Sequence, residues 1–327
     1  EEEGAFTAER GSGDLRYGSV EVSIPRTHKP GEIERPPIWQ LELEDPRDHM
    51  VVVRREVTDR DRFFADIRDT LRRGGSKASF VFVHGFNVSF DDAARRTAQI
   101  TFDLDFPGAP VFYSWPSQAR EDAYADDERN AEWSQPRLKA FLADHATRSG
   151  AEDIYLIAHS LGTRILAGAL AELFTEQPLL RSRFKEIILT APDIDADTFK
   201  SDIAPKLVTG TGKVTLYVSS IDKALRAAHA ATGRTRLGET TAQAADIPGV
   251  ETIEASAVDT SFAERAYADQ LTVLADIRRV VVDGARAVER GLQVYESAGG
   301  RFWRLDGNAA PRTERWAREP RRFQLAA

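Results

Sequence analysis

The chain has 327 residues, of which 42% are hydrophobic and 29% are charged, so it is long enough to bury a large core. A formal net charge of −8 argues against nucleic acid or an anionic membrane as the main partner, and no apolar run approaches the roughly 20 residues that span a bilayer. The absence of cysteine excludes disulfides, thiolate catalysis and zinc–thiolate sites.

Residues 1–49 are rich in proline, glycine and charge, with a short β-like piece at 19–24. Their prolines forbid a long helix, so we predict an N-terminal extension that packs on the following domain. A strand at 50–54 then precedes a helix at 58–73, which the pair Gly74-Gly75 ends.

From that point predicted strands and helices alternate. The strands are expected at 79–83, 111–113, 154–158, 186–189, 214–218 and 250–255. The helices are expected at 91–102, 121–146, 161–173, 198–207, 224–231 and 267–282. Short apolar strands in this alternation are typical of a doubly wound, mostly parallel α/β sheet with helices on both faces. We therefore assign one domain to 50–298 and a C-terminal tail to 299–327, with residues 302–305 as a docking segment of that tail.

The most informative motif follows the strand at 154–158. The run Ala158-His-Ser-Leu-Gly162 ends the strand and becomes helical at once, which is the layout of a nucleophile elbow with alanine in the first glycine position of G-x-S-x-G. Small residues must flank the serine because the sharp turn brings two backbones together. Ser160 is the candidate nucleophile; the alternative is a tight turn with a helix-capping serine.

Oxyanion donors are expected from two backbone amides. Val83-His-Gly-Phe-Asn87 follows one strand and precedes a helix that Ser89 and Asp92 signal as a capping box. An α/β-hydrolase places one donor there, near Phe86, and the other at the residue after the nucleophile, Leu161. An ordinary strand-end turn is the competing interpretation.

The acid that orients the base should follow a later strand. Asp222 comes just after the strand at 214–218 and is favoured, whereas Asp193 and Asp195 offer an alternative one strand earlier. Each of these aspartates could equally cap a helix.

The base is the difficulty, because the loop between 256 and 267 contains no histidine and none follows His229. That loop offers Glu264 and Arg265, but arginine stays protonated and cannot accept the serine proton. His229 and Glu264 are therefore the alternative bases. His159 should point away from its serine neighbour, so we assign it a structural role.

Together these motifs resemble the bacterial α/β-hydrolases of the DUF900 group, described as esterase/lipase-superfamily enzymes of unknown function. The resemblance spans nearly the whole chain. Its matches are Tyr17-Gly, Val22–Pro25, His28, Phe82–Asn87, Tyr113–Ser117, Tyr124, Asp127, Ala158–Gly162, Ala191–Asp195, Ser219–Asp222, Val258–Ser261 and Phe302–Arg304. It implies an α/β-hydrolase fold with Ser160 and Asp222 in catalytic roles, and it puts the catalytic histidine of typical members at the position of Arg265.

Two functional hypotheses follow. The first is a carboxylesterase or lipase-like serine hydrolase that forms an acyl-enzyme on Ser160 and is impaired by Arg265. The second is a pseudoenzyme that keeps the pocket for an anionic or acyl ligand. We expect a small-molecule ester or acyl substrate, no cofactor, no metal, no nucleic acid and no transmembrane segment. Because the chain begins with Glu1, we expect a trimmed or processed N-terminus, and both compartment (bacterial cytoplasm or exported) and oligomeric state stay open.

Overall fold

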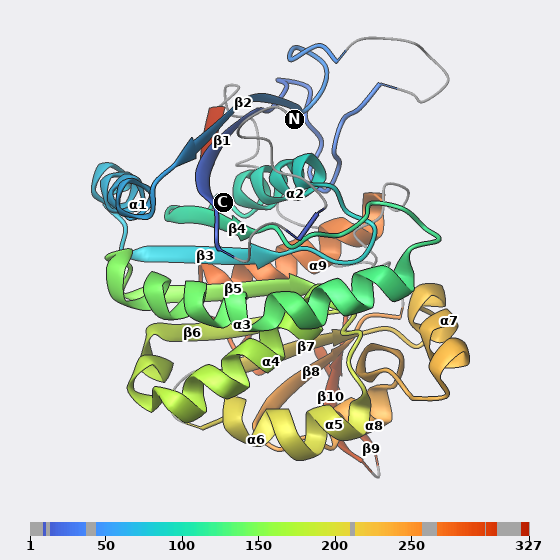
Figure 1. The fold of residues 1–327 in the computed structure, drawn as a ribbon. Helices are drawn as coiled ribbons and strands as arrows, with labels where there is room; N and C mark the ends of the chain where they lie inside the picture. The colour runs from blue at the N-terminus through green and yellow to red at the C-terminus, as the bar shows by residue number, and fades with distance from the viewer. Residues whose placement is uncertain are drawn as a thin grey trace.

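A computed structural model describes residues 9–10, 14–36, 44–209, 213–256, 267–297, 299–305 and 322–326. Within these residues the strands form one sheet in the order β2-β1-β11-β4-β3-β5-β6-β7-β8-β10-β9 (Figure 1). The strands are β1 Tyr17–Ser23, β2 Val51–Thr58, β3 Ala78–Val83, β4 Ala109–Tyr113, β5 Asp153–His159, β6 Phe184–Thr190, β7 Lys213–Val218, β8 Val250–Glu254, β9 Gln293–Ser297, β10 Gly300–Arg304 and β11 Arg322–Ala326.

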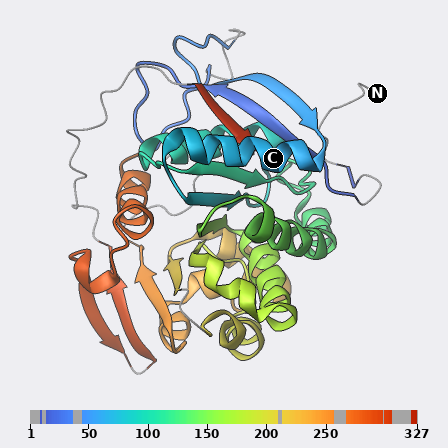
Figure 2. The ribbon, with the colours of Figure 1, turned by 90° about the vertical axis from the view of Figure 1, so that its left-hand side faces the viewer.

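The central strands from β4 through β8 pair in parallel, and antiparallel pairs occur toward the two edges, where β1 joins β2 and β11 and where β9 joins β10. Figure 2 shows the β9–β10 hairpin at one edge of the sheet and β1 with β2 toward the other. This mostly parallel sheet, covered by helices, confirms the predicted α/β-hydrolase architecture.

The described helices lie close to the predicted ranges, except α8, which was not predicted. They are α1 Arg60–Gly74, α2 Phe90–Asp103, α3 Tyr124–Arg148, α4 Leu161–Glu176, α5 Ala196–Thr198, α6 Ala204–Leu207, α7 Lys223–Thr232, α8 Thr241–Ala245 and α9 Tyr267–Val281. The helix expected at 198–207 is interrupted by a π-helical turn at Phe199–Ile203, so it divides into α5 and α6.

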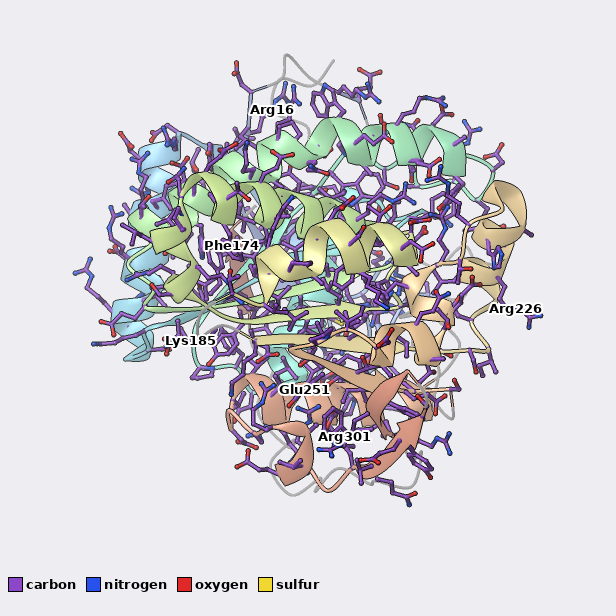
Figure 3. All side chains as sticks on the ribbon, turned by 90° about the horizontal axis from the view of Figure 1, so that it is seen from below. Arg16, Phe174, Lys185, Arg226, Glu251 and Arg301 are labelled. Atoms are coloured by element: carbon purple, nitrogen blue, oxygen red, sulfur yellow. The ribbon has the colours of Figure 1, made fainter. Side chains whose placement is uncertain are left out.

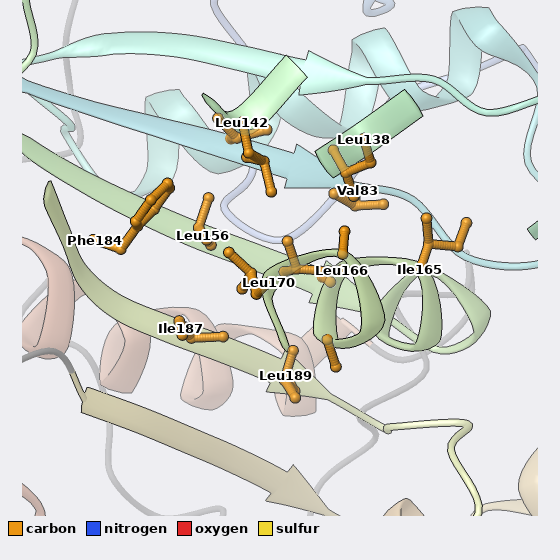
Figure 4. Packing of buried hydrophobic residues seen from close by; sticks show 14 of the residues in the cluster. Val83, Leu138, Leu142, Leu156, Ile165, Leu166, Leu170, Phe184, Ile187 and Leu189 are labelled. Carbon is orange, nitrogen blue, oxygen red and sulfur yellow. The ribbon is translucent and has the colours of Figure 1, made fainter. Parts of the chain in front are cut away.

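Alternating strand residues build two cores, one on each face of the sheet. Helices α1, α3, α4 and α6 cover the face that carries Val81, Leu156 and Leu189. Figure 4 shows Leu156, Ile187 and Leu189 of the sheet packing against Leu166 and Leu170 of α4. Helices α2 and α9 cover the opposite face, which carries Phe80, Phe82, Ile157 and Ile188. Charged side chains such as Lys185 and Arg226 are exposed on the surface of the molecule (Figure 3).

Both chain ends contribute strands to this sheet. β1 lies in the segment assigned to the N-terminal extension, and residues 302–304 of the segment expected to dock belong to β10, which pairs with β8. The extension is also held by His28, whose Nδ1 lies 2.9 Å from a Glu34 oxygen and whose Nε2 lies 3.0 Å from Asp103. Burial alone would lower the pKa of His28, but the hydrogen bonds to Asp103 and Glu34 outweigh it and raise that pKa to about 9.

Candidate active site

Ser160 occupies the turn between β5 and α4 in a conformation that non-glycine residues rarely adopt, with φ 49° and ψ −125°. Its N–H donates to the Thr190 carbonyl of the neighbouring strand at 3.0 Å, and its own carbonyl accepts the Thr163 N–H at 3.0 Å. The Ser160 side chain makes no capping hydrogen bond to α4. Its hydroxyl therefore does not serve the helix cap that was the alternative interpretation.

The loop that is expected to supply an oxyanion donor, residues 84–88 after β3, lies directly against this turn, and we refer to it as the oxyanion loop. A Cβ added at Gly85 would stand 3.0 Å from the Ser160 Cβ and 2.9 Å from the His159 Nδ1. Leu161 is the first residue of α4, where N–H groups lack an acceptor one turn earlier in the helix. Ser160 therefore lies between two backbone segments. One is the loop that carries the Phe86 amide, and the other is the start of α4.

His84 is the first residue of this loop. Its ring is buried and stacks on Trp115, with centroids 5.0 Å apart and planes at 9°. The Trp115 N–H donates to His84 Nε2 at 3.2 Å, so Nδ1 carries the proton and donates to the Gly85 carbonyl at 3.0 Å. Burial lowers the pKa of His84 to about 4, which keeps the ring neutral. These bonds give His84 a structural role in shaping the loop.

Asp127 supports the same loop from the first turn of α3. Its fully buried carboxylate accepts the Ser117 hydroxyl at 2.6 Å, the Gln118 N–H at 2.7 Å and the Asn87 N–H at 3.4 Å. Asn87 adjoins Phe86 and itself has a positive φ of 58°. In the sequence Asp127 stands out only through the family resemblance, because tertiary packing brings its three partners together and no local pattern indicates them.

The three candidate acids lie in different environments. Asp222, between β7 and α7, accepts the N–H groups of Ala224 at 2.9 Å and Leu225 at 3.0 Å as the helix cap. Asp195 caps α5 by accepting the Thr198 N–H at 2.8 Å. Asp193 is buried, with contacts to one tyrosine and two arginines.

Five of the six histidines have ring partners other than Ser160. His28 pairs with Glu34 and Asp103, His49 accepts the Asp45 N–H, His84 contacts Gly85 and Trp115, His145 bonds Ser79, and His229 pairs with Glu239. His229 lies on α7 with a side chain that is 45% exposed and 2.6 Å from the Glu239 carboxylate. The sixth, His159, packs beside Gly85. Glu264 and Arg265 lie outside the described residues.

Within the described ranges no cluster of His, Asp or Glu side chains is arranged to hold a metal ion. Among the helices that the structure describes, none combines the length and apolar character needed to cross a membrane.

A family model described as "Alpha/beta hydrolase of unknown function (DUF900)" matches residues 59–266. The comparison with solved structures returns "The crystal structure of the putative cell surface hydrolase from Lactobacillus plantarum WCFS1", at 12% identity and a TM-score of 0.37, over 64% of this chain and 93% of that one. The comparison with curated proteins finds no match.

Proposed function

Because the chain belongs to the DUF900 family of α/β-hydrolases, we propose that it is a serine hydrolase that cleaves a carboxylic ester through an acyl-enzyme on Ser160. The observation that carries the proposal is the backbone of Ser160, which is held at φ 49° beside the oxyanion loop while its hydroxyl is not used as a helix cap. Such strain at a serine between a parallel strand and a helix is the geometry of a nucleophile elbow.

In the proposed reaction Ser160 Oγ attacks the ester carbonyl carbon and a base takes the hydroxyl proton. The carbonyl oxygen becomes an oxyanion that accepts hydrogen bonds from the Phe86 and Leu161 amides. Collapse of this intermediate expels the alcohol, which takes up a proton, and water then releases the acid from Ser160. One such donor is worth about 10²–10³ in rate.

Asp222 is our candidate for the acid that orients the base. It follows β7, which agrees with the chain order of serine, acid and base in this fold. The N–H groups of Ala224 and Leu225 both donate to Oδ1 of Asp222. The Asp193 carboxylate instead has a tyrosine on one oxygen and two arginines at the other.

The proposed site lacks the histidine that would normally act as the general base. Arg265 stands where the family resemblance puts the histidine, and a guanidinium cannot accept a proton at neutral pH. Glu264, the sequence neighbour of Arg265, is our first substitute, because His229 is bound to Glu239 on an exposed helix face. We therefore propose an enzyme with slow acylation.

Fluorophosphonate labelling tests the proposal, because the probe phosphonylates an activated serine without requiring turnover. We expect one adduct on Ser160 by peptide mapping and none in Ser160→Ala. Hydrolysis of a short-chain p-nitrophenyl ester should be slow and abolished by the same substitution. Absence of labelling at Ser160 in the wild-type protein would contradict the proposal.

The second candidate is a pseudoenzyme that binds an anionic or acyl ligand. The observation that favours it is the missing histidine between residues 256 and 267, together with the cationic Arg265, which suits a carboxylate or phosphate. Calorimetric binding of a fatty acid without probe labelling would support this candidate. Ester turnover that depends on Ser160 would reject it.

A further inference from the structure

We propose that Tyr124 and Asp193 are positioning residues that couple the oxyanion loop to the nucleophile elbow. This inference rests on the proposed serine hydrolase function. Neither residue is assigned to touch the substrate. They act by fixing the Phe86 amide relative to Ser160, through a continuous set of contacts that begins at the turn after β6 and ends at the loop after β3.

The first contact joins Asp193 to the elbow. The Asp193 N–H donates to the Ser160 carbonyl at 3.4 Å, and the turn that carries Asp193 includes Ala191, which has a positive φ of 46°. Arg164, one helical turn after Ser160, donates from Nε to the Asp193 carbonyl at 3.1 Å. The backbone of Asp193 is thus fixed to both the serine and its helix.

The second set of contacts fixes the Asp193 carboxylate, whose side chain is only 2% exposed. Arg236 Nε lies 3.2 Å and Arg164 Nη2 lies 3.5 Å from Oδ1, while the Tyr124 hydroxyl donates to Oδ2 at 2.6 Å. Arg164 is held in turn by Glu128 at 2.6 Å. Burial and the neighbouring Asp193 charge raise the pKa of Tyr124, so its hydroxyl keeps the proton that it donates.

The last contact reaches the oxyanion loop. The Tyr124 ring meets the Phe86 ring edge to face, with centroids 5.3 Å apart and planes at 71°. Tyr124 and Asp127 share the first turn of α3, so that turn contacts the loop at Phe86 and at Asn87. Asp127 holds the loop to its own helix, whereas Tyr124 connects the loop to Asp193 and hence to Ser160.

The test compares Tyr124→Phe with Tyr217→Phe. Both remove a hydroxyl that donates at 2.6 Å to a buried carboxylate, but Tyr124 is half-buried, whereas Tyr217 is fully buried and bonds Asp276 of α9 on the opposite face of the sheet. Two quantities are measured for the folded proteins. One is amide hydrogen exchange of residues 83–88, and the other is the rate of fluorophosphonate labelling at increasing probe concentration.

We expect Tyr124→Phe to exchange faster at residues 83–88. Its maximal labelling rate should fall by about 10-fold at an unchanged half-saturating probe concentration, because small misplacements of reacting groups cost up to about 10²-fold. Tyr217→Phe should leave both quantities at the wild-type value. Wild-type behaviour of Tyr124→Phe, or equal losses in both variants, would overturn the inference. If the wild-type protein takes up no probe, the proposed function fails, and exchange at 83–88 alone decides whether the coupling exists.

Discussion

Gly162 lies so close to His84 that a Cβ on Gly162 would stand 2.3 Å from the His84 carbonyl oxygen. The same Cβ would lie 2.7 Å from the Val83 carbonyl oxygen, so it would meet backbone rather than a movable side chain. The second small residue of the elbow is therefore required by the oxyanion loop, which packs on the first turn of α4.

Gly162→Ala should displace either the loop or the start of α4. We expect a loss of stability of about 1–3 kcal/mol and a loss of probe labelling at Ser160, measured by urea unfolding and mass spectrometry. The matched control is Gly168→Ala in the same helix, where the three atoms nearest the new Cβ all belong to the end of the Gln135 side chain, which can rotate away. Equal effects of the two substitutions would contradict this explanation.

Asp127→Asn should loosen the oxyanion loop while keeping the side-chain shape. The amide presents N–H groups where the carboxylate accepts from Ser117, Gln118 and Asn87, so at least one buried donor loses its acceptor. The expected cost is about 1–3 kcal/mol in the free energy of unfolding, with slower labelling of Ser160.

The neighbouring Asp126→Asn serves as the control for Asp127→Asn. The Asp126 side chain is 58% exposed, and among the ion pairs of the described residues it pairs only with Arg129. Loss of this exposed ion pair should change the free energy of unfolding by less than about 0.5 kcal/mol. An Asp127 variant as stable and as reactive as the Asp126 variant would refute the assignment.

His28 should make the stability of the protein depend on pH. Its folded pKa of about 9 lies above the ordinary value of 6.5, so the protonated form is favoured on folding. The contribution is fully present below pH 6.5 and is lost as pH rises through about 9; it amounts to no more than about 3 kcal/mol. Urea unfolding of wild type and His28→Gln between pH 6 and 9.5 checks this, since the variant should lose less stability over that window. Parallel curves would show that His28 is not responsible.

Arg265→His should raise ester hydrolysis, because it restores an imidazole at the position where the family resemblance expects the base. A general base contributes about 10²–10⁴ in rate, so we expect a gain of at least about 10-fold in kcat/KM, abolished by Ser160→Ala. Arg265→Gln controls for the removal of the positive charge alone. No gain with histidine would place the base elsewhere in the chain.

Local patterns in the sequence determined the secondary-structure elements and predicted the elbow at Ser160. Short apolar runs predicted the central strands within about two residues of their observed ends, because a strand buried on both faces of a sheet reads as a nearly continuous run of apolar residues. The small residues around Ser160 indicate a tight turn, which is also a local feature of the chain. The α/β architecture follows from the order of such segments along the chain.

Only the tertiary structure decided which distant segments meet. β11, from residues 322–326, pairs with both β1 and β4, and residues 302–304 belong to β10, which extends the sheet beside β8. The sequence left Asp193 open as a catalytic acid or a helix cap, and only the structure shows its partners from α3, α4 and the segment before Leu237. The physical reason is that a carboxylate has the same local sequence signature whether a histidine, a backbone N–H or an arginine lies against it. Its role depends on neighbours that long-range packing brings together.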